Sequence, residues 1–155
     1  MAADTELALE PIGIVRSPLV GRKDAPRSPA DGPAAILDID ERFVAALEGV
    51  RPGMELIVVT WLHQAHRDVL QVHRRRDQTL PLTGVFTTRS PDRPNPIGIH
   101  RVTITMVDAT RRLHVAALEA VDGTPILDLK AAVDPGEAAN RTSSPSGLRR
   151  RASTS

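Results

Sequence analysis

The chain has 155 residues, 41% hydrophobic and 25% charged, with no cysteine and a formal net charge of +1. A chain of this length can bury roughly 70% of its unfolded surface and so fold without a disulfide or a metal, and the lack of cysteine excludes disulfides and thiol catalysis. The charge is too small to indicate a nucleic-acid partner by itself. The chain has only three aromatic residues, Phe43, Trp61 and Phe86, so we expect an aliphatic core.

Short apolar segments separated by thirteen prolines and ten glycines predict strands joined by turns. In chain order, we expect strands at residues 12–15, 35–39, 55–62, 69–73, 84–88, 99–107, 113–118 and 126–129. A long proline-rich loop at 16–33 follows the first strand, and one helix at 40–48 has Asp40 as its N-cap and Gly49 as its stop. About seven short strands with one helix favour an all-β barrel or sandwich. The sequence contains no glycine-rich fingerprint of a Rossmann fold.

The two ends of the chain differ from this central part. Residues 1–10 lack a basic start and an apolar stretch, so they do not resemble a secretory signal. The apolar runs are far shorter than the ~18 residues of a membrane span, and we expect a cytoplasmic protein with no membrane partner. The expected organisation is an N-terminal extension at 1–10, a folded domain at 11–133 and a flexible basic tail rich in Ser, Pro and Arg at 134–155.

The most unusual segment covers residues 84–99 and contains three prolines within six residues. Proline fixes the backbone and removes an amide donor, so this segment predicts a rigid loop. Such a loop presents Arg89, Ser90, Arg93 and Asn95 at little ordering cost. The alternative is a stiff turn whose arginines lie in solvent.

Four further motifs accompany this segment. They are Pro11-Ile12-Gly13-Ile14-Val15-Arg16-Ser17-Pro18, Pro26-Arg27-Ser28-Pro29, Trp61-Leu62-His63-Gln64 and Asp122-Gly123-Thr124-Pro125-Ile126-Leu127-Asp128-Leu129-Lys130. In their order and content, the five motifs resemble the TrmO/TsaA-like family of β-barrel tRNA adenine methyltransferases. The resemblance implies a single-sheeted antiparallel β-barrel that binds S-adenosylmethionine, forms a homodimer and methylates N6 of (threonylcarbamoyl-)adenosine at position 37 of the tRNA anticodon loop.

The resemblance also implies where the cofactor would bind. The matching positions are Ser28, Pro29, Ala30, His63, Gln64, Arg89, Ile99, Asp122, Gly123 and Thr124. Because the cofactor carries an amino-acid zwitterion, we expect Arg89 to bind its carboxylate and Asp122 to accept hydrogen bonds from its ammonium group or its ribose. At Gly123 the backbone can approach a ligand closely.

Methyl transfer requires an in-line approach of the nucleophile, so most of the catalysis should be positioning. The exocyclic amine of adenine must also lose a proton. We predict Asp128 and His66 as candidate acceptors and Asn95 as an orienting group.

Basic residues are the predicted tRNA contacts: Arg74, Arg75, Arg76, Arg93 and Lys130. In a tRNA enzyme the run at 74–76 would lie along phosphates and make binding salt-dependent. The alternative is a solvated loop, and the run at 149–151 allows the same two interpretations.

Three alternatives concern function and metal binding. Ala131 and Ala132 stand where the family usually has proline and an aromatic residue, a departure that bears on nucleic-acid recognition more than on the cofactor. A non-catalytic module that binds S-adenosylmethionine or a nucleoside, and a methyltransferase acting on a small molecule, are the alternatives to a tRNA enzyme.

The group of His63, His66, Asp68 and His73 is a weak metal candidate. Residues three apart on a strand point to opposite faces, so we expect no metal.

Overall fold

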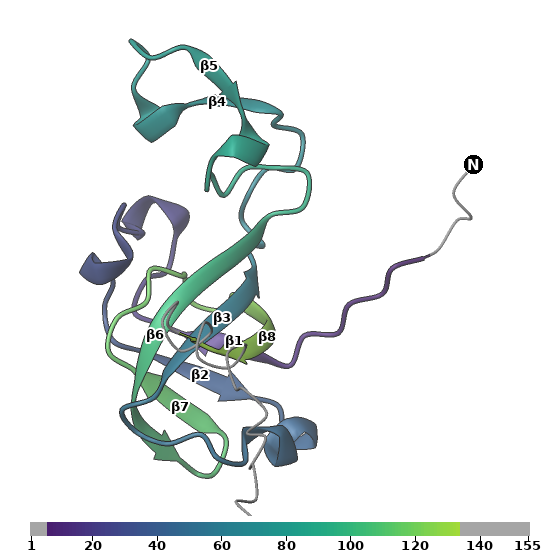
Figure 1. The fold of residues 1–155 in the computed structure, drawn as a ribbon, viewed down its shortest axis with the longest axis vertical. Helices are drawn as coiled ribbons and strands as arrows, with labels where there is room; N and C mark the ends of the chain where they lie inside the picture. Colours follow the sequence, from purple (N-terminus) through teal and green to yellow (C-terminus); the bar gives the residue numbers. More distant parts are fainter. Residues whose placement is uncertain (1–5, 134–155) are drawn as a thin grey trace, which may run out of the picture.

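The computed structural model describes residues 6–133. The strands in this range are β1 (Gly13–Arg16), β2 (Ala35–Ile39), β3 (Glu55–Trp61), β4 (Gln71–His73), β5 (Leu82–Gly84), β6 (Ile97–Asp108), β7 (Arg112–Val115) and β8 (Pro125–Ala131). Six of them close an antiparallel barrel in the order β1-β2-β7-β6-β3-β8, while β4 and β5 form a separate hairpin that projects from it (Figure 1). The predicted all-β, single-sheeted antiparallel barrel is confirmed.

The barrel interior follows from the alternation of side chains along its strands. In β3, Leu56, Val58 and Thr60 are buried, and in β6 the inward positions from His100 to Ile104 alternate with exposed ones. The buried apolar side chains of the described range are all Val, Leu, Ile or Ala, so the prediction of an aliphatic core is confirmed. Because the inward positions near the start of β6 hold glycine and histidine, the apolar core gives way to polar groups at this end of the barrel.

The predicted helix is present as the 3-10 helix η3 (Glu41–Leu47). Asp40 caps it by accepting a hydrogen bond of 3.0 Å from the backbone N–H of Arg42, and Gly49 follows with a φ of +90°. Both residues therefore have the positions that the sequence predicts. Four shorter 3-10 turns occur in loops: η1 (Arg22–Asp24), η2 (Pro29–Asp31), η4 (Arg74–Arg76) and η5 (Val85–Thr87).

The strand predicted at 84–88 is wrong. Strand β5 ends at Gly84, and the next three residues form the turn η5. Two threonine hydroxyls explain the difference, because Thr87 donates to the carbonyl of Gly84 at 2.8 Å and Thr88 to that of Val85 at 2.9 Å. Such local side-chain bonds compete with a strand ladder.

The chain before β1 has no regular structure in residues 6–10. The predicted basic tail at 134–155, with its arginine run at 149–151, lies outside the described residues. Among the described residues, no helix has the length and apolar character needed to span a membrane.

Candidate functional site

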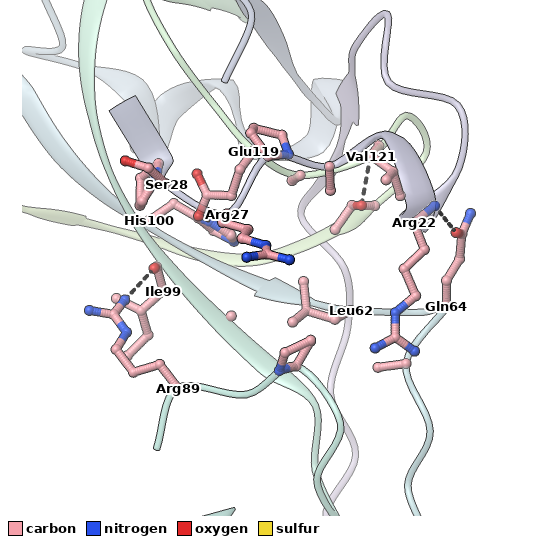
Figure 2. A pocket seen from close by; sticks show the side chains of 18 of the residues that line it. Arg22, Arg27, Ser28, Leu62, Gln64, Arg89, Ile99, His100, Glu119 and Val121 are labelled. Atoms are coloured by element: carbon pink, nitrogen blue, oxygen red, sulfur yellow. Dashed lines mark hydrogen bonds and ion pairs between the residues drawn. The ribbon is translucent and has the colours of Figure 1, made fainter. Parts of the chain in front are cut away.

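A pocket of about 840 Å³ lies at the end of the barrel where β6 begins and β3 ends (Figure 2). The segments that contribute to its wall are far apart in the sequence. They include residues 22–31 of the long loop, 62–65 after β3, 75–76 after β4, 89–93 of the proline-rich loop, 97–100 of β6, and 119–121 and 124 before β8.

The pocket wall combines cationic and apolar groups. Its arginines are Arg22, Arg27, Arg75, Arg76, Arg89 and Arg93, whereas Asp31 and Glu119 are its two carboxylates. Figure 2 shows Arg22, Arg27 and Arg89 approaching this space from different segments, with the apolar side chains of Leu62, Ile99 and Val121 around it. Such a wall suits a ligand that has an anionic group and an apolar or aromatic body.

The proline-rich loop is fixed to the rest of the pocket through Asp92. One carboxylate oxygen of Asp92 accepts from the Arg22 guanidinium at 2.7 Å, and the other accepts from the backbone N–H of His66 at 2.8 Å. Arg67 holds the same loop by donating to the carbonyl of Pro94 at 2.7 Å. The rigid loop predicted from the sequence is therefore held by polar contacts as well as by proline.

The protonation of Asp92 depends on this clamp. Partial burial on its own raises the pKa of Asp92, but the hydrogen bonds from Arg22 and His66 and the charge of Arg22 outweigh it, so the pKa is lowered. Asp92 therefore stays ionised at neutral pH and holds Arg22, and with it the long loop, against the proline-rich loop.

The two arginines of the proline-rich loop are anchored to backbone groups. Arg89 donates from one terminal nitrogen to the carbonyl of Ile99 at 2.8 Å. Arg93 donates to the carbonyl of Thr88 at 3.1 Å and also to that of Val85. Since each guanidinium has five N–H donors, Arg89 keeps donors for a ligand while its position is fixed.

Seven of the ten predicted cofactor residues line the pocket: Ser28, Pro29, His63, Gln64, Arg89, Ile99 and Thr124. Ala30, Asp122 and Gly123 are not among the lining residues. Asp122 instead caps the start of the long loop by accepting from the backbone N–H of Ser17 at 3.0 Å. Gly123 has a φ of +78°, a conformation that glycine adopts without strain.

None of the three predicted proton-transfer residues lines the pocket. Asp128 lies on β8, half-exposed, where it pairs with Lys130 at 3.1 Å. His66 has an exposed side chain beside the proline-rich loop, and the Asn95 amide oxygen accepts from Arg67 at 3.0 Å. Their proposed roles stay predictions, and the structure does not bring the three side chains together.

Among the predicted tRNA contacts, Arg75, Arg76 and Arg93 line the pocket, whereas Arg74 and Lys130 do not. Arg75 and Arg76 have left-handed backbone conformations, with φ values of 53° and 57°. Such conformations cost roughly 1–2 kcal/mol per non-glycine residue and cluster at functional sites. The strained pair contributes two exposed guanidinium groups to the wall of the pocket.

The sequence reasoning missed a buried polar group in the pocket. His100, only 5% exposed, contacts the Glu119 carboxylate through Nδ1 at 2.6 Å and the Thr60 hydroxyl through Nε2 at 2.7 Å. One signal could have revealed it: His100 occupies an inward position in a strand whose next inward residues are Val102 and Ile104.

The described residues contain no group of three His, Cys, Asp or Glu side chains that could hold a metal ion. The histidines considered as ligands are used otherwise or lie apart. The ring of His73, for example, contacts the carbonyl of Leu80 through Nδ1 at 2.8 Å.

Two relatives resemble this chain over most of its length. A probable S-adenosyl-L-methionine-binding protein of Methanothermobacter thermautotrophicus is 35% identical over 129 residues, which cover 83% of this chain and 91% of the relative. An S-adenosyl-L-methionine-binding protein of Archaeoglobus fulgidus is 40% identical over 126 residues, covering 80% and 88% of the two chains.

Solved structures show the same likeness. The crystal structure of TrmO from Pseudomonas aeruginosa superimposes with a TM-score of 0.67 at 29% identity, covering 92% of this chain but 62% of that one. The present chain thus spans less than two thirds of the length of that TrmO. The family model for the tRNA-methyltransferase O N-terminal domain matches residues 14–135. The chain therefore belongs to the tRNA-methyltransferase O N-terminal domain family.

Proposed function

We propose that the pocket binds S-adenosylmethionine and that the protein transfers its methyl group to N6 of (threonylcarbamoyl-)adenosine at position 37 of tRNA. The observation that carries this proposal is the convergence of Arg89, Gln64 and Thr124 on one pocket whose wall also includes Arg75 and Arg76. Family membership and the names of the relatives support the cofactor.

The groups in the pocket fit this cofactor. Its carboxylate needs a cation, and Arg89 has free donors after its bond to Ile99. Its ammonium and ribose hydroxyls need acceptors, which Glu119 supplies within the same wall. Its adenine and methylene carbons need apolar contact, which Leu62 and Val121 provide.

When bound, the cofactor supplies an electrophilic methyl group on a sulfonium. The protein's contribution is to hold the acceptor amine in line with that methyl, since positioning alone can remove a large part of the barrier. Arg22 and Asp92 fix the two loops that frame the pocket, so their ion pair preserves this geometry. The transfer would leave S-adenosyl-L-homocysteine and one proton, which would pass to solvent water because none of the predicted proton acceptors lines the pocket.

The arginines in the pocket wall support a nucleic-acid acceptor. Arg75 and Arg76 present exposed guanidinium groups there. A guanidinium pairs well with a phosphate because its planar fork can donate two parallel hydrogen bonds to two phosphate oxygens. With Arg22, Arg27 and Arg93 in the same wall, the cationic surface exceeds what one cofactor carboxylate requires. An anticodon loop supplies the additional negative charge.

A second function has its own support. None of Asp128, His66 and Asn95 lines the pocket, and the curated relatives are named for binding S-adenosyl-L-methionine. A binding module that does not catalyse transfer is therefore the competing proposal.

Transfer of label separates the two functions. The protein is incubated with methyl-labelled S-adenosylmethionine and total tRNA, and the tRNA is digested to nucleosides. The proposal predicts that label appears in an N6-methylated adenosine derivative, and that it appears only when active protein is present. Cofactor binding in calorimetry without label in any nucleoside would favour the binding module.

A further inference from the structure

One aromatic ring of this protein lies on the surface. Phe86, in the turn η5, is 82% exposed. The other two aromatic residues are partly buried: Phe43 packs against the core, and the Arg67 guanidinium lies over the ring of Trp61, 5.1 Å from its centre. Phe86 forgoes the stabilisation that burial would provide, and its ring is available to a partner.

The turn that carries Phe86 is held in place on both sides of that residue. The side chain of Val85 is buried, and its backbone N–H donates to the carbonyl of Leu70 at 3.0 Å. The Thr87 hydroxyl donates to the carbonyl of Gly84 at 2.8 Å. The turn follows β5, where the chain returns from the hairpin toward the barrel (Figure 1). An aromatic ring on a fixed backbone loses little conformational entropy when it binds.

Two arginines bind the same turn. Arg74 donates to the carbonyl of Thr87 at 3.3 Å. Arg93 donates to the carbonyls of Val85 and Thr88, the latter at 3.1 Å. Carbonyl groups before and after the exposed ring therefore bind guanidinium groups. Because Arg93 also lines the pocket, the turn adjoins the pocket wall.

The charge of this region indicates the kind of partner. Residues 70–93 contain five arginines and two aspartates, and both aspartates already accept hydrogen bonds from other residues of the protein. Leu70 and Leu82, beside and within the hairpin, are more than half exposed. A matching partner offers flat apolar groups together with negative charge, as unpaired RNA does through its bases and phosphates. A second copy of this region would carry the same positive charge and be repelled.

We propose that Phe86 stacks on an unpaired base of the RNA substrate, beside the nucleotide that enters the pocket. Aromatic side chains in single-strand binding sites stack on bases while cationic groups follow the phosphates. The arginines near η5 supply the second part of that combination, and Phe86 supplies the first. The inference rests on the proposed tRNA substrate, and it assigns Phe86 to the affinity and positioning of the RNA rather than to removal of a proton.

Two RNA probes test the inference on the full chain. One is a synthetic anticodon stem–loop with adenosine at position 37, and the other is a fully paired RNA duplex of the same length, which offers no unpaired base. Phe86→Leu should weaken binding of the stem–loop on the order of five- to a hundredfold in a filter assay, the value of one base stacked on an aromatic ring. Binding of the duplex should not change. The salt dependence of stem–loop binding should also stay the same, because the ring contacts no phosphate.

Two further variants complete the design. Phe86→Trp keeps an aromatic face and should retain the affinity of the wild-type protein for the stem–loop. Leu7→Ala is the matched control, because Leu7 is also 82% exposed but lies in the segment before β1 and does not line the pocket. It should leave the affinities for both RNAs unchanged. Because Phe86 is exposed, its variants should unfold in urea at the same concentration as the wild-type protein.

The outcomes are distinct. Wild-type affinity of Phe86→Leu for the stem–loop would overturn the inference, and so would equal weakening of stem–loop and duplex binding. If Phe86→Leu keeps its affinity for the stem–loop but converts a dimer to a monomer in ultracentrifugation, the ring packs against a second copy and the inference is wrong. Wild-type protein that binds neither RNA would reject the tRNA substrate and the stacking contact together. The expected dependence on Phe86 without any transfer of methyl label would uphold the contact and reject only the proposed methyl transfer.

Discussion

Replacing Gly98 with alanine should destabilise the barrel at the floor of the pocket. The new methyl group would lie 2.5 Å from the Thr60 oxygen, 2.8 Å from Nε2 of His100 and 3.1 Å from a methyl carbon of Leu62. Thr60 and His100 are buried and fixed by their own contact, so neither can move without losing it. Overpacking costs about 1–3 kcal/mol, and a buried polar group left without a partner costs about 1–3 kcal/mol more.

The expected decrease in the free energy of unfolding is therefore about 2–6 kcal/mol, measured by urea denaturation at pH 7. Gly84→Ala is the matched control, because Gly84 has an extended backbone with φ −63° and ψ 138° and nothing within 4 Å of an added Cβ. That control should change stability by no more than about 1 kcal/mol. Equal stabilities of the two variants would refute the packing argument at Gly98.

Three other predictions follow from the contacts of the pocket. Because the pKa of Asp92 is lower in the folded than in the unfolded protein, the ionised carboxylate stabilises the fold at neutral pH, and this stabilisation is lost as the pH falls below about 4. Asp92→Asn should therefore lower the free energy of unfolding by about 1–3 kcal/mol at pH 7 and by less at pH 3. A difference in urea denaturation that does not change with pH would contradict this. Arg89→Ala should abolish S-adenosylmethionine binding in calorimetry, and unchanged affinity would remove Arg89 from the site. Replacing Arg74, Arg75 and Arg76 together with alanine should weaken tRNA binding in a filter assay and reduce its salt dependence, whereas identical salt slopes would leave only the solvated-loop interpretation.

The strands of the barrel could be predicted because their signal is local. In β6, buried and exposed residues alternate from Ile97 to Thr105, and the sequence shows the same period. The strand expected at 84–88 could not be excluded from its β-branched residues. This segment forms a turn because two threonine hydroxyls donate to carbonyls three residues earlier in the chain. The pattern of apolar residues does not reveal such hydrogen bonds.

Part of the candidate site could likewise be predicted from the sequence, and part could not. Arg89, Gln64 and Thr124 could be placed in one pocket because they lie in motifs that resemble a family. The pairing of His100 with Glu119 could not, because it depends on how the loop after β7 returns to the start of β6. Neither residue lies in one of the five motifs. The only signal in the sequence is the inward position of His100 in β6.

The central claim is that this pocket holds the cofactor, and photo-cross-linking of methyl-labelled S-adenosylmethionine tests it most directly. After irradiation of the full chain and proteolysis, mass spectrometry maps the labelled peptides. We expect label on residues of the pocket wall, which lie within 22–31, 62–65, 75–76, 89–93, 97–100, 119–121 and at 124. Label confined to a second hollow of the barrel, beside Arg16 and His114, would contradict this claim.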